Sequence, residues 1–296
     1  MNGILIINKE KGYTSHDVVA KLRGILHIKK IGHTGTLDPD ATGVLPVCIG
    51  NATKVCDLLM DRTKTYTAGV KLGIVTDTQD ISGTVLSESP ANVTEDRLLS
   101  SVNRFLGEID QLTPMYSARK VNGQKLVDLA RQGKTVERPV KRVRIDSITV
   151  SDFNPAEGTF SMQVTCSKGT YIRTLCNDIG EALGCGACMT SLQRDASGEF
   201  TLSDAVTLSE VEMLRDGERL AEIIKPTDSV FTEFSRADVT EEGRKYLTNG
   251  NPLSVEHLSL PKNPTETVRV YMDGMFSALY ERKGPVYKPV KMFFES

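Results

Sequence analysis

The chain has no tryptophan, few cysteines and no long apolar run, with only six cysteines among 296 residues. That number is too small for a disulfide-built scaffold in a chain of this size. The apolar runs are short, such as residues 4–7, and none could cross a bilayer. No basic stretch followed by an apolar one opens the chain, so we expect a cytoplasmic protein with no secretory signal and no membrane partner.

A strong net charge is also missing, because basic and acidic residues nearly balance at −2. This balance argues against a uniformly basic RNA-binding chain, but the charges are unevenly distributed. Residues 114–145 hold nine basic and two acidic side chains, whereas residues 199–242 hold four basic and twelve acidic ones. The basic segment is therefore predicted to contact phosphate, and Gly123 and Gly133 within it indicate an insertion that reaches outward.

The pattern of apolar residues predicts an α+β fold in one large or two ordinary domains, because helices and strands mix without regular βαβ alternation. Thr14 or Ser15 is expected to cap one helix, and a Thr207–Glu210 capping box opens another. Helices are expected over 18–26, 94–106, 172–183 and after Thr207, and strands over 4–7, 44–47, 65–72, 144–150, 159–165, 252–255, 268–272, 276–280 and 290–294. Short strands dominate beyond about residue 230, which predicts a small, mostly-β module.

The loop at residues 32–43 places one carboxylate, Asp38, among glycines. Glycine lets the backbone turn sharply and lets a ligand approach, and Pro39 restricts how the Asp38 carboxylate is presented. A single carboxylate on a rigid loop suits nucleophilic or general-base chemistry. An ordinary surface turn is the alternative, because the same residue types form turns. A phosphate-binding loop is disfavoured, since the G-x-x-x-x-G-K-[ST] spacing is absent.

Cys185 and Cys188 form a single C-x-x-C pair, the spacing of a zinc knuckle. Zinc would need two more ligands, which Cys166 and Cys176 could supply. An isolated pair without a matching second pair is a weak signal, so we expect buried small side chains and no metal.

Several segments closely resemble one family. The sequence GHTGTLDPDATGVL at residues 32–45 resembles the catalytic loop of bacterial tRNA pseudouridine-55 synthases of the TruB type. The segments 166–174, 183–187 and 191–194 resemble later motifs of that family, and 3–9 and 64–66 resemble earlier ones. These matches follow the family's order and extend from about residue 3 to about residue 230.

The resemblance implies a pseudouridine-synthase catalytic core of mixed α/β structure at residues 1–228, carrying the basic insertion at about 114–142. It also implies a PUA-like domain at residues 229–296. Basic and acidic residues are equal in number in this second segment, which makes its contribution to RNA binding an open question.

The activity implied by the resemblance is isomerisation of uridine 55 in the T loop of tRNA, by a monomer that uses no cofactor, metal or nucleotide. The uridine would have to leave its stack to react, as in other enzymes that act on a base. A non-catalytic tRNA-folding factor acting on the T arm is the alternative from another class. A T-loop mimic in a different transcript is an alternative substrate.

Matching positions imply three catalytic residues. Asp38 is the expected nucleophile, and Arg173 is expected to keep it ionised and to orient it through a bidentate pair. Tyr66 would stack on the flipped uracil or remove a sugar proton. A phenol of ordinary pKa is a poor base at neutral pH, so stacking is the better-supported role.

Six further residues are expected to bind substrate or shape the site. Asp80 is either a second carboxylate beside Arg173 or the cap of a turn. His33 is expected to stack beside or contact the displaced base, and the alternative is an ordinary polar surface group. The remaining four are Tyr171 and Leu192, which match pocket positions of the family, and Lys9 and Arg194, which would contact phosphate or shape the site. Glu10 stands where the family usually has proline, which makes the turn after Lys9 less predictable.

Overall fold

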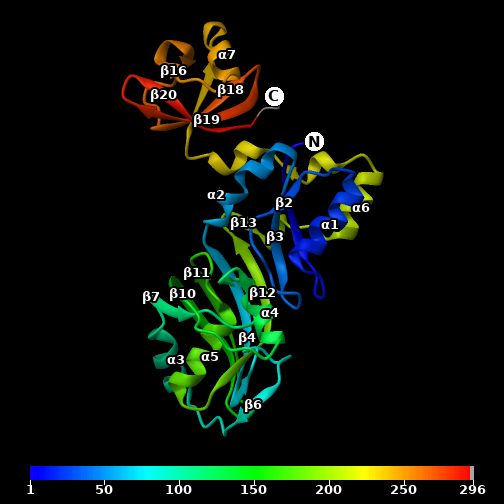
Figure 1. Cartoon of the computed structure of the whole chain (residues 1–296), viewed down its shortest axis with the longest axis vertical. Coiled ribbons are helices and arrows are strands. Elements are labelled where there is room, and N and C mark those ends of the chain that lie inside the picture. The colour runs from blue at the N-terminus through cyan, green and yellow to red at the C-terminus, as the bar shows by residue number, and fades with distance from the viewer. Residues whose placement is uncertain (294–296) are drawn as a thin grey trace.

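The computed structural model describes residues 1–293 and contains two sheets of unequal size (Figure 1). A ten-stranded sheet runs through the larger part of the chain, and a six-stranded sheet forms a smaller module at its C-terminal end. The predicted strand at 290–294 is seen as the end of a strand that stops at Met292, and its last residue lies outside the described range.

The larger part contains the ten-stranded sheet, two small hairpins and six helices within its described residues. Its strands are β1 (Gly3–Lys9), β2 (Ile31–His33), β3 (Thr42–Ile49), β4 (Lys64–Leu72), β5 (Ile74–Thr76), β6 (Val85–Glu88), β7 (Gly107–Leu112), β8 (Lys120–Val121), β9 (Gln124–Lys125), β10 (Val140–Asn154), β11 (Thr159–Cys166), β12 (Ala187–Ser197), β13 (Phe200–Thr201) and β14 (Ile224–Lys225). Its α-helices are α1 (Ser15–Leu26), α2 (Cys56–Met60), α3 (Glu95–Asn103), α4 (Leu126–Arg131), α5 (Ile172–Leu183) and α6 (Leu208–Asp216).

The ten-stranded sheet has the order β14-β1-β3-β12-β4-β11-β10-β7, with β2 beside β3 and β13 beside β12. The strands β3, from the start of the larger part, and β12, from near its end, therefore meet inside the sheet. The parallel pairing of β12 with β3 brings Gln193 opposite Thr42, directly after the glycine-rich loop. This junction places residues from four distant segments around Asp38.

The run Ile4–Ile7 is continuously apolar because its strand is covered on both faces. Leu5 and Ile7 pack with α1 and α6, whereas Ile4 and Ile6 pack toward α2 and the C-terminal module. A half-buried strand would instead alternate apolar and polar residues. In the other half of the sheet, α3 and α5 cover one face (Figure 1).

The helix starts follow from local hydrogen bonds. Thr14 caps α1 by accepting the Asp17 N–H while Asp17 accepts the Thr14 N–H, so the predicted capping position is confirmed at Thr14. The predicted box at Thr207 and Glu210 is confirmed in the same way. Each box satisfies backbone N–H groups that the first helical turn leaves free.

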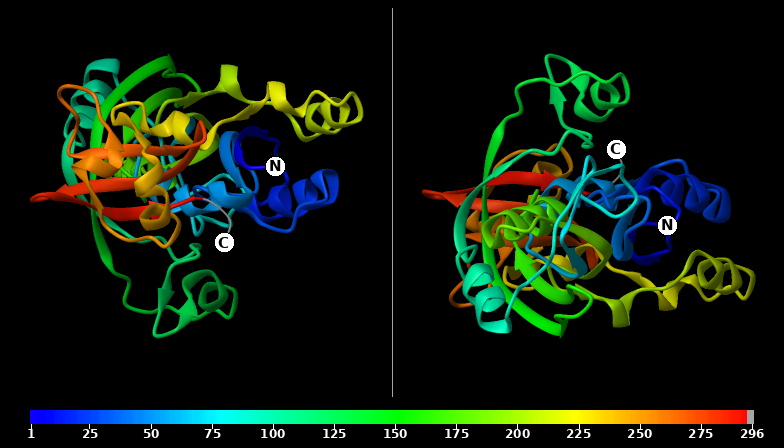
Figure 2. Two further views of the ribbon diagram at one scale, coloured as in Figure 1. Left: turned by 90° about the horizontal axis from the view of Figure 1, so that it is seen from above. Right: turned by 90° about the horizontal axis from the view of Figure 1, so that it is seen from below.

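The basic insertion leaves the sheet after β7 and returns into β10. Its residues form the short hairpin β8–β9 and the helix α4, which stand out from the body of the sheet (Figure 2). The insertion is anchored where Val140 pairs with Leu112.

The C-terminal module has the strand order β16-β20-β19-β18-β15-β17 and one α-helix. Its elements are β15 (Ser235–Val239), α7 (Glu241–Thr248), β16 (Leu253–Ser254), β17 (Leu258–Ser259), β18 (Thr267–Met272), β19 (Met275–Lys283) and β20 (Val286–Met292). Phe231, Phe276 and Phe293 join the apolar cluster that contains Val55 and Leu59 of the larger part, so the two parts share packed side chains.

Some element predictions were wrong. No strand was predicted at β12, because the run Thr190–Asp195 is polar, yet β12 is an eleven-residue strand at the sheet's centre. The helix predicted over 94–106 ends at Asn103, and the strand predicted over 44–47 extends from Thr42 to Ile49. Cross-strand partners decide the extent of the two strands, and a local pattern does not contain them.

Candidate active site

The loop that carries Asp38 runs between β2 and β3 and is fixed by bonds from the N-terminal segment. Lys9 Nζ donates to the Pro39 carbonyl at 3.0 Å, and the Gly12 N–H donates to the same oxygen at 2.9 Å. The Leu37 N–H donates to Ser15 Oγ at 2.9 Å. These contacts hold the residues on both sides of Asp38, while 44% of the Asp38 side chain stays exposed for a substrate.

Gly43 closes the loop at a position where only glycine fits. Its φ is +101°, and a Cβ there would lie 2.3 Å from the Arg194 carbonyl oxygen of β12. The close approach of loop and strand therefore depends on the missing side chain.

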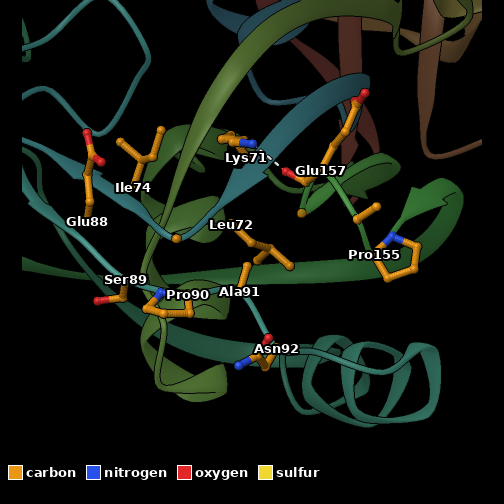
Figure 3. A pocket seen from close by; sticks show the side chains of 13 residues that line it. Lys71, Leu72, Ile74, Glu88, Ser89, Pro90, Ala91, Asn92, Pro155 and Glu157 are labelled. Carbon is orange, nitrogen blue, oxygen red and sulfur yellow. Dashed lines mark hydrogen bonds between the residues drawn. The ribbon is translucent and has the colours of Figure 1, made fainter.

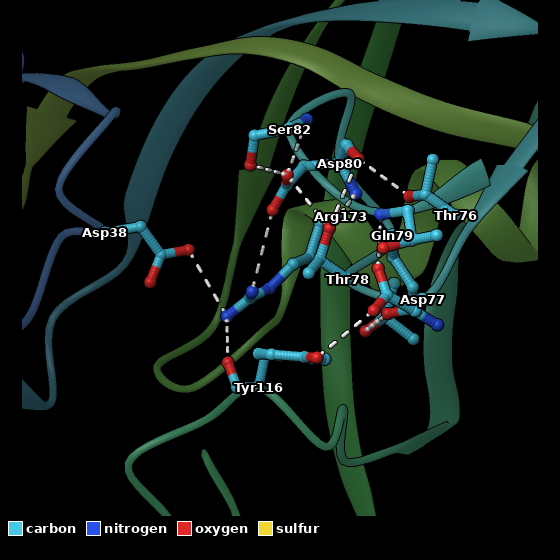
Figure 4. A network of polar contacts seen from close by, with 11 residues as sticks. Asp38, Thr76, Asp77, Thr78, Gln79, Asp80, Ser82, Tyr116 and Arg173 are labelled. Carbon is cyan, nitrogen blue, oxygen red and sulfur yellow. Dashed lines mark hydrogen bonds and ion pairs between the residues drawn. The ribbon is translucent and has the colours of Figure 1, made fainter. Parts of the chain in front are cut away.

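Arg173 in the first turn of α5 lies beside Asp38 and is 8% exposed (Figure 4). Its Nη2 lies 3.3 Å from Asp38 Oδ2 and donates to the Tyr116 carbonyl at 2.7 Å. Its Nη1 lies 3.9 Å from Asp80 Oδ2. The expected bidentate pair with Asp38 is wrong, because the two guanidinium nitrogens are divided between the carboxylates.

Asp80 combines the two roles that the sequence left open. Its Oδ1 accepts hydrogen bonds from the Ser82 N–H at 3.0 Å and from Thr78 Oγ1 at 3.0 Å, as in a capped turn. Its Oδ2 faces Arg173. The turn thus fixes the carboxylate that helps to hold the arginine.

Tyr66 of β4 is paired in register with Arg194 of β12 and is half-buried. Burial raises the pKa of the Tyr66 phenol, and the Arg194 guanidinium opposes this rise through its charge and a hydrogen bond. The nearby Asp38 carboxylate raises the same pKa further. The phenol is therefore neutral at physiological pH, which favours stacking over proton abstraction.

Lys9 and Arg194 are fully buried, so the expected phosphate contact does not fit this arrangement. Besides Pro39, Lys9 Nζ donates to the carbonyls of Tyr13 and Glu10, at 2.5 and 3.1 Å. Arg194 Nε donates to the Val44 carbonyl at 2.6 Å. Both residues therefore support the backbone of the site from the protein interior. Burial lowers the pKa of Lys9, and the negative charge of Asp38 opposes that shift. The Lys9 bond to Glu10 uses the main chain, so the glutamate side chain does not prevent it.

His33, Tyr171 and Leu192 are half-buried around this centre. His33 is not a free surface group, because its Nδ1 lies 3.0 Å from the Gly35 carbonyl within the loop. The backbone of Tyr171 exchanges two hydrogen bonds with the Gln111 amide, at 2.9 and 3.0 Å. Within residues 1–293, no hydrogen bond or ion pair joins these three residues to Asp38, so their substrate roles stay predictions.

Sequence reasoning missed a set of residues that supports Arg173 (Figure 4). Tyr116, at the start of the insertion, accepts from Arg173 through its carbonyl, and its hydroxyl donates to Asp77 Oδ2 at 3.1 Å. Gln79 accepts from Thr174 Oγ1 at 2.8 Å. No side-chain pattern signals a carbonyl acceptor, although the basic run around Tyr116 marked the segment.

A cavity of about 580 Å³ lies elsewhere, near the far end of β4 (Figure 3). Its lining includes Lys71, Glu88, Asn92 and Glu157, and none of the predicted site residues. Lys71 is five residues beyond Tyr66, which along a strand is roughly 17 Å. The site at Asp38 is therefore an open surface site and not this cavity.

The described residues contain no group of three histidine, cysteine or acidic side chains placed to hold a metal ion. The zinc alternative for Cys185 and Cys188 therefore finds no support, and Cys188 is a buried small side chain of β12. None of the helices in this part of the chain is long and apolar enough to span a membrane.

A pseudouridine-synthase fold is indicated by solved structures similar to this one. An H/ACA RNP bound to a substrate RNA containing 2′-deoxyuridine matches with a TM-score of 0.74 and 26% identity, over 99% of this chain and 85% of the other. A Cbf5-Nop10-Gar1 complex matches with a TM-score of 0.72 and 27% identity, over the same shares.

Comparisons with family models and with curated relatives identify the family within the pseudouridine synthases. Residues 23–172 match the TruB family pseudouridylate synthase N-terminal domain, and residues 173–232 match the tRNA pseudouridylate synthase B C-terminal domain. The chain is 49% identical to a tRNA pseudouridine synthase B of Lachnoclostridium phytofermentans, over 99% of this chain and all of the relative. It is 42% identical to a protein of the same name from Lactobacillus acidophilus, over 100% of this chain and 99% of the relative.

The chain therefore belongs to the TruB family of pseudouridylate synthases, and it is an isomerase that converts uridine to pseudouridine. The predicted family and the α+β fold with its mostly-β C-terminal module are confirmed. The boundary at residue 228 and the PUA-like character of the second domain stay predictions.

Proposed function

We propose that this chain isomerises uridine 55 in the T loop of tRNA, with Asp38 as the nucleophile acting on a flipped-out base. The observation that carries the proposal is the position of Asp38, a half-exposed carboxylate on a fixed loop, 3.3 Å from the buried guanidinium of Arg173. A carboxylate beside a cation stays ionised at neutral pH and can act as a nucleophile.

The reaction breaks the N1–C1′ bond of uridine and forms a C5–C1′ bond. The uracil turns before it reattaches, the proton on C5 is lost, and N1 gains a proton, so no oxidant or co-substrate is consumed. Asp38 attacks C1′ in an acylal route or C6 of the base in a Michaelis route, and a glycal route requires removal of the C2′ proton. All three routes require an ionised carboxylate next to the target nucleotide.

The tRNA substrate is supported by the name of the relatives, tRNA pseudouridine synthase B. The basic insertion supplies the phosphate contacts. Arg119, Lys120 and Lys125 on it are exposed, and Arg173 bonds to the insertion's first segment through Tyr116. We propose that the insertion clamps the T arm and that the chain acts as a monomer.

The substrate is tested with three unmodified RNAs: full-length tRNA, a T stem-loop fragment, and tRNA in which uridine 55 is replaced by cytidine. Pseudouridine is mapped chemically at single-nucleotide resolution. The proposal predicts product at position 55 in the first two RNAs and none in the third. Product at other uridines of the third RNA would contradict T-loop specificity.

The alternative of a non-catalytic tRNA-folding factor is not supported, because the relatives of this chain are named as tRNA pseudouridine synthases. Binding of all three RNAs without any pseudouridine would contradict the proposal.

A further inference from the structure

The first turn of α1 contacts the segment that leads into Asp38 at two points, Leu37 and His33. Ser15 Oγ accepts the Leu37 N–H at 2.9 Å. His16 Nδ1 lies 3.4 Å from His33 Nε2, and the two rings meet edge to face with centroids 5.4 Å apart. His16 is exposed and His33 is half-buried, so the contact extends from the helix surface into the site.

The hydrogen-bond partners decide where the protons of this pair lie. His33 Nδ1 is 3.0 Å from the Gly35 carbonyl, and a carbonyl only accepts, so Nδ1 carries the hydrogen. In a neutral ring the other nitrogen, Nε2, then has a free lone pair and must accept. His16 Nδ1 is therefore the donor to His33, and both rings are in the Nδ1–H form.

We propose that His16 is a positioning residue that fixes the orientation of the His33 ring for the isomerisation. This inference rests on the proposed function, because it gives His33 a role at the Asp38 site. Since Gly35 and His16 occupy both ring nitrogens, His33 presents only its ring face to a ligand. It is built to stack on a planar nucleobase and not to read the base by hydrogen bonds.

The electrostatic surroundings keep His33 neutral. Burial lowers its pKa first, and the nearby His16 of α1 and Arg194 of β12 lower it further, against the Gly35 carbonyl. His16 also neighbours Asp17 on its own helix. Protonation of both rings would place one N–H against another, so the contact requires at least one neutral ring.

The test compares His16→Phe with His16→Asn. Phenylalanine keeps a ring for the edge-to-face contact but has no N–H, whereas the asparagine amide nitrogen can occupy the position of Nδ1. His27→Asn is the matched control, because it makes the same change at the other end of α1, where the left-handed backbone suits asparagine.

The first readout is the His33 tautomer, observed by ¹⁵N NMR of the imidazole nitrogens in the protein without RNA. Because the Gly35 carbonyl holds the Nδ1 hydrogen, we expect the Nδ1–H form in all four proteins, with the His33 Nε2 resonance moved to that of an unbonded acceptor in His16→Phe alone. A wild-type His33 in the Nε2–H form would overturn the inference whatever the activity is.

The second readout is the single-turnover rate on tRNA. We expect about a tenfold loss in His16→Phe, the value of one hydrogen bond, with recovery to within about threefold of wild type in His16→Asn. Equal rates in wild type and His16→Phe would overturn the positioning role. If the NMR result is as expected but wild type forms no pseudouridine, the contact stands and the proposed function fails.

Discussion

Arg173 is the residue on which the geometry of the site converges. One guanidinium group serves the Asp38 carboxylate, the Asp80 carboxylate and the Tyr116 carbonyl, which lie in three directions. A planar fork with five N–H donors can serve all three at once, and a single ammonium group cannot. The arginine thereby joins the catalytic loop, the turn after β5 and the root of the insertion.

Arg173→Lys should therefore lower the single-turnover rate by at least about 100-fold, because lysine cannot keep all three contacts. Stopped-time assays on tRNA measure the rate, and circular dichroism checks the fold. Arg219→Lys, in an exposed pair with Glu222, is the matched control and should change nothing. A near-normal rate for Arg173→Lys would show that the reaction does not depend on the three contacts of Arg173.

The sequence predicted the residues of this centre better than their bonding. Asp38 and Arg173 were predicted from the resemblance of their motifs to one family, and Asp80 as one of two alternatives, and the structure places both carboxylates beside Arg173. The division of the guanidinium between two carboxylates, and the Tyr116 carbonyl, depend on how distant segments meet in space. The full burial of Lys9 and Arg194 could not be inferred for residue types that are mostly exposed.

The raised pKa of Tyr66 leads to a pH test. When the pKa of a phenol lies above its usual value of about 10, the ionised fraction rises tenfold for each pH unit between pH 7 and 9. If Tyr66 were the base, the single-turnover rate would rise in the same proportion. We expect no such rise, because stacking on the uracil is the role that we predict for the ring. A tenfold rise per unit that disappears in Tyr66→Phe would contradict the stacking role.

At the scale of elements, α5 contains a half-buried carboxylate, Asp178, that lowers the stability of the fold. Burial is the largest cause that raises the pKa of Asp178 to about 6, and Glu181 raises it as well. A group whose folded pKa exceeds its unfolded value contributes no penalty below the unfolded value, near pH 4, and destabilises the fold as pH rises through 6.

Asp178→Asn should therefore raise the free energy of unfolding at pH 7.5 by on the order of 1 kcal/mol and leave it unchanged near pH 4. Urea unfolding at the two pH values measures this difference. Asp152→Asn, at an exposed position of β10 with a left-handed backbone, is the control and should show no pH-dependent gain. An equal effect of Asp178→Asn at both pH values would contradict the burial argument.

The insertion is the element that the account assigns to RNA phosphate. Replacing Arg119, Lys120 and Lys125 with alanine should weaken tRNA binding and reduce the slope of log affinity against log salt by about 2–3. A filter-binding series over salt concentration measures the slope. An unchanged slope would contradict the proposal that the insertion binds RNA phosphate through its basic side chains.

A matched variant lies in the C-terminal module, where three exposed bases can be replaced together. These bases are Arg282, Lys283 and Lys288. Because this module has equal numbers of acidic and basic residues, we expect a smaller change in slope than for the insertion. A larger change would indicate that the C-terminal module, and not the insertion, makes the main phosphate contacts.

The fold was predictable where apolar periodicity was strong and not where polar residues line an open site. The strand at residues 4–7 and the helix at 172–183 agree with the pattern, since their side chains build the core. The strand β12 was not predicted, because it carries the polar residues that face the site as well as the core. The functional edge of the sheet is thus where local patterns are weakest.

At the scale of the whole molecule, the two parts are joined by packing and by charge. Phe231, Phe276 and Phe293 pack together at the junction, and Lys291 pairs with Asp57 at 2.6 Å. The shared cluster lies on the face of β1 opposite to α1, so the C-terminal module supports the strand that ends in Lys9 beneath the catalytic loop.

The central claim is that a fixed, half-exposed Asp38 performs the isomerisation, and one measurement tests it directly. Wild type, Asp38→Asn and Asp40→Asn are incubated with unmodified tRNA, pseudouridine is mapped at single-nucleotide resolution, and tRNA binding is measured in parallel. Asp40 is a control on the same loop, because its side chain is 67% exposed and its ion pair with Lys11 is long at 3.9 Å. We predict product at position 55 from wild type and Asp40→Asn and none from Asp38→Asn, with binding within a few-fold for all three. Product from Asp38→Asn at the wild-type rate would contradict the account.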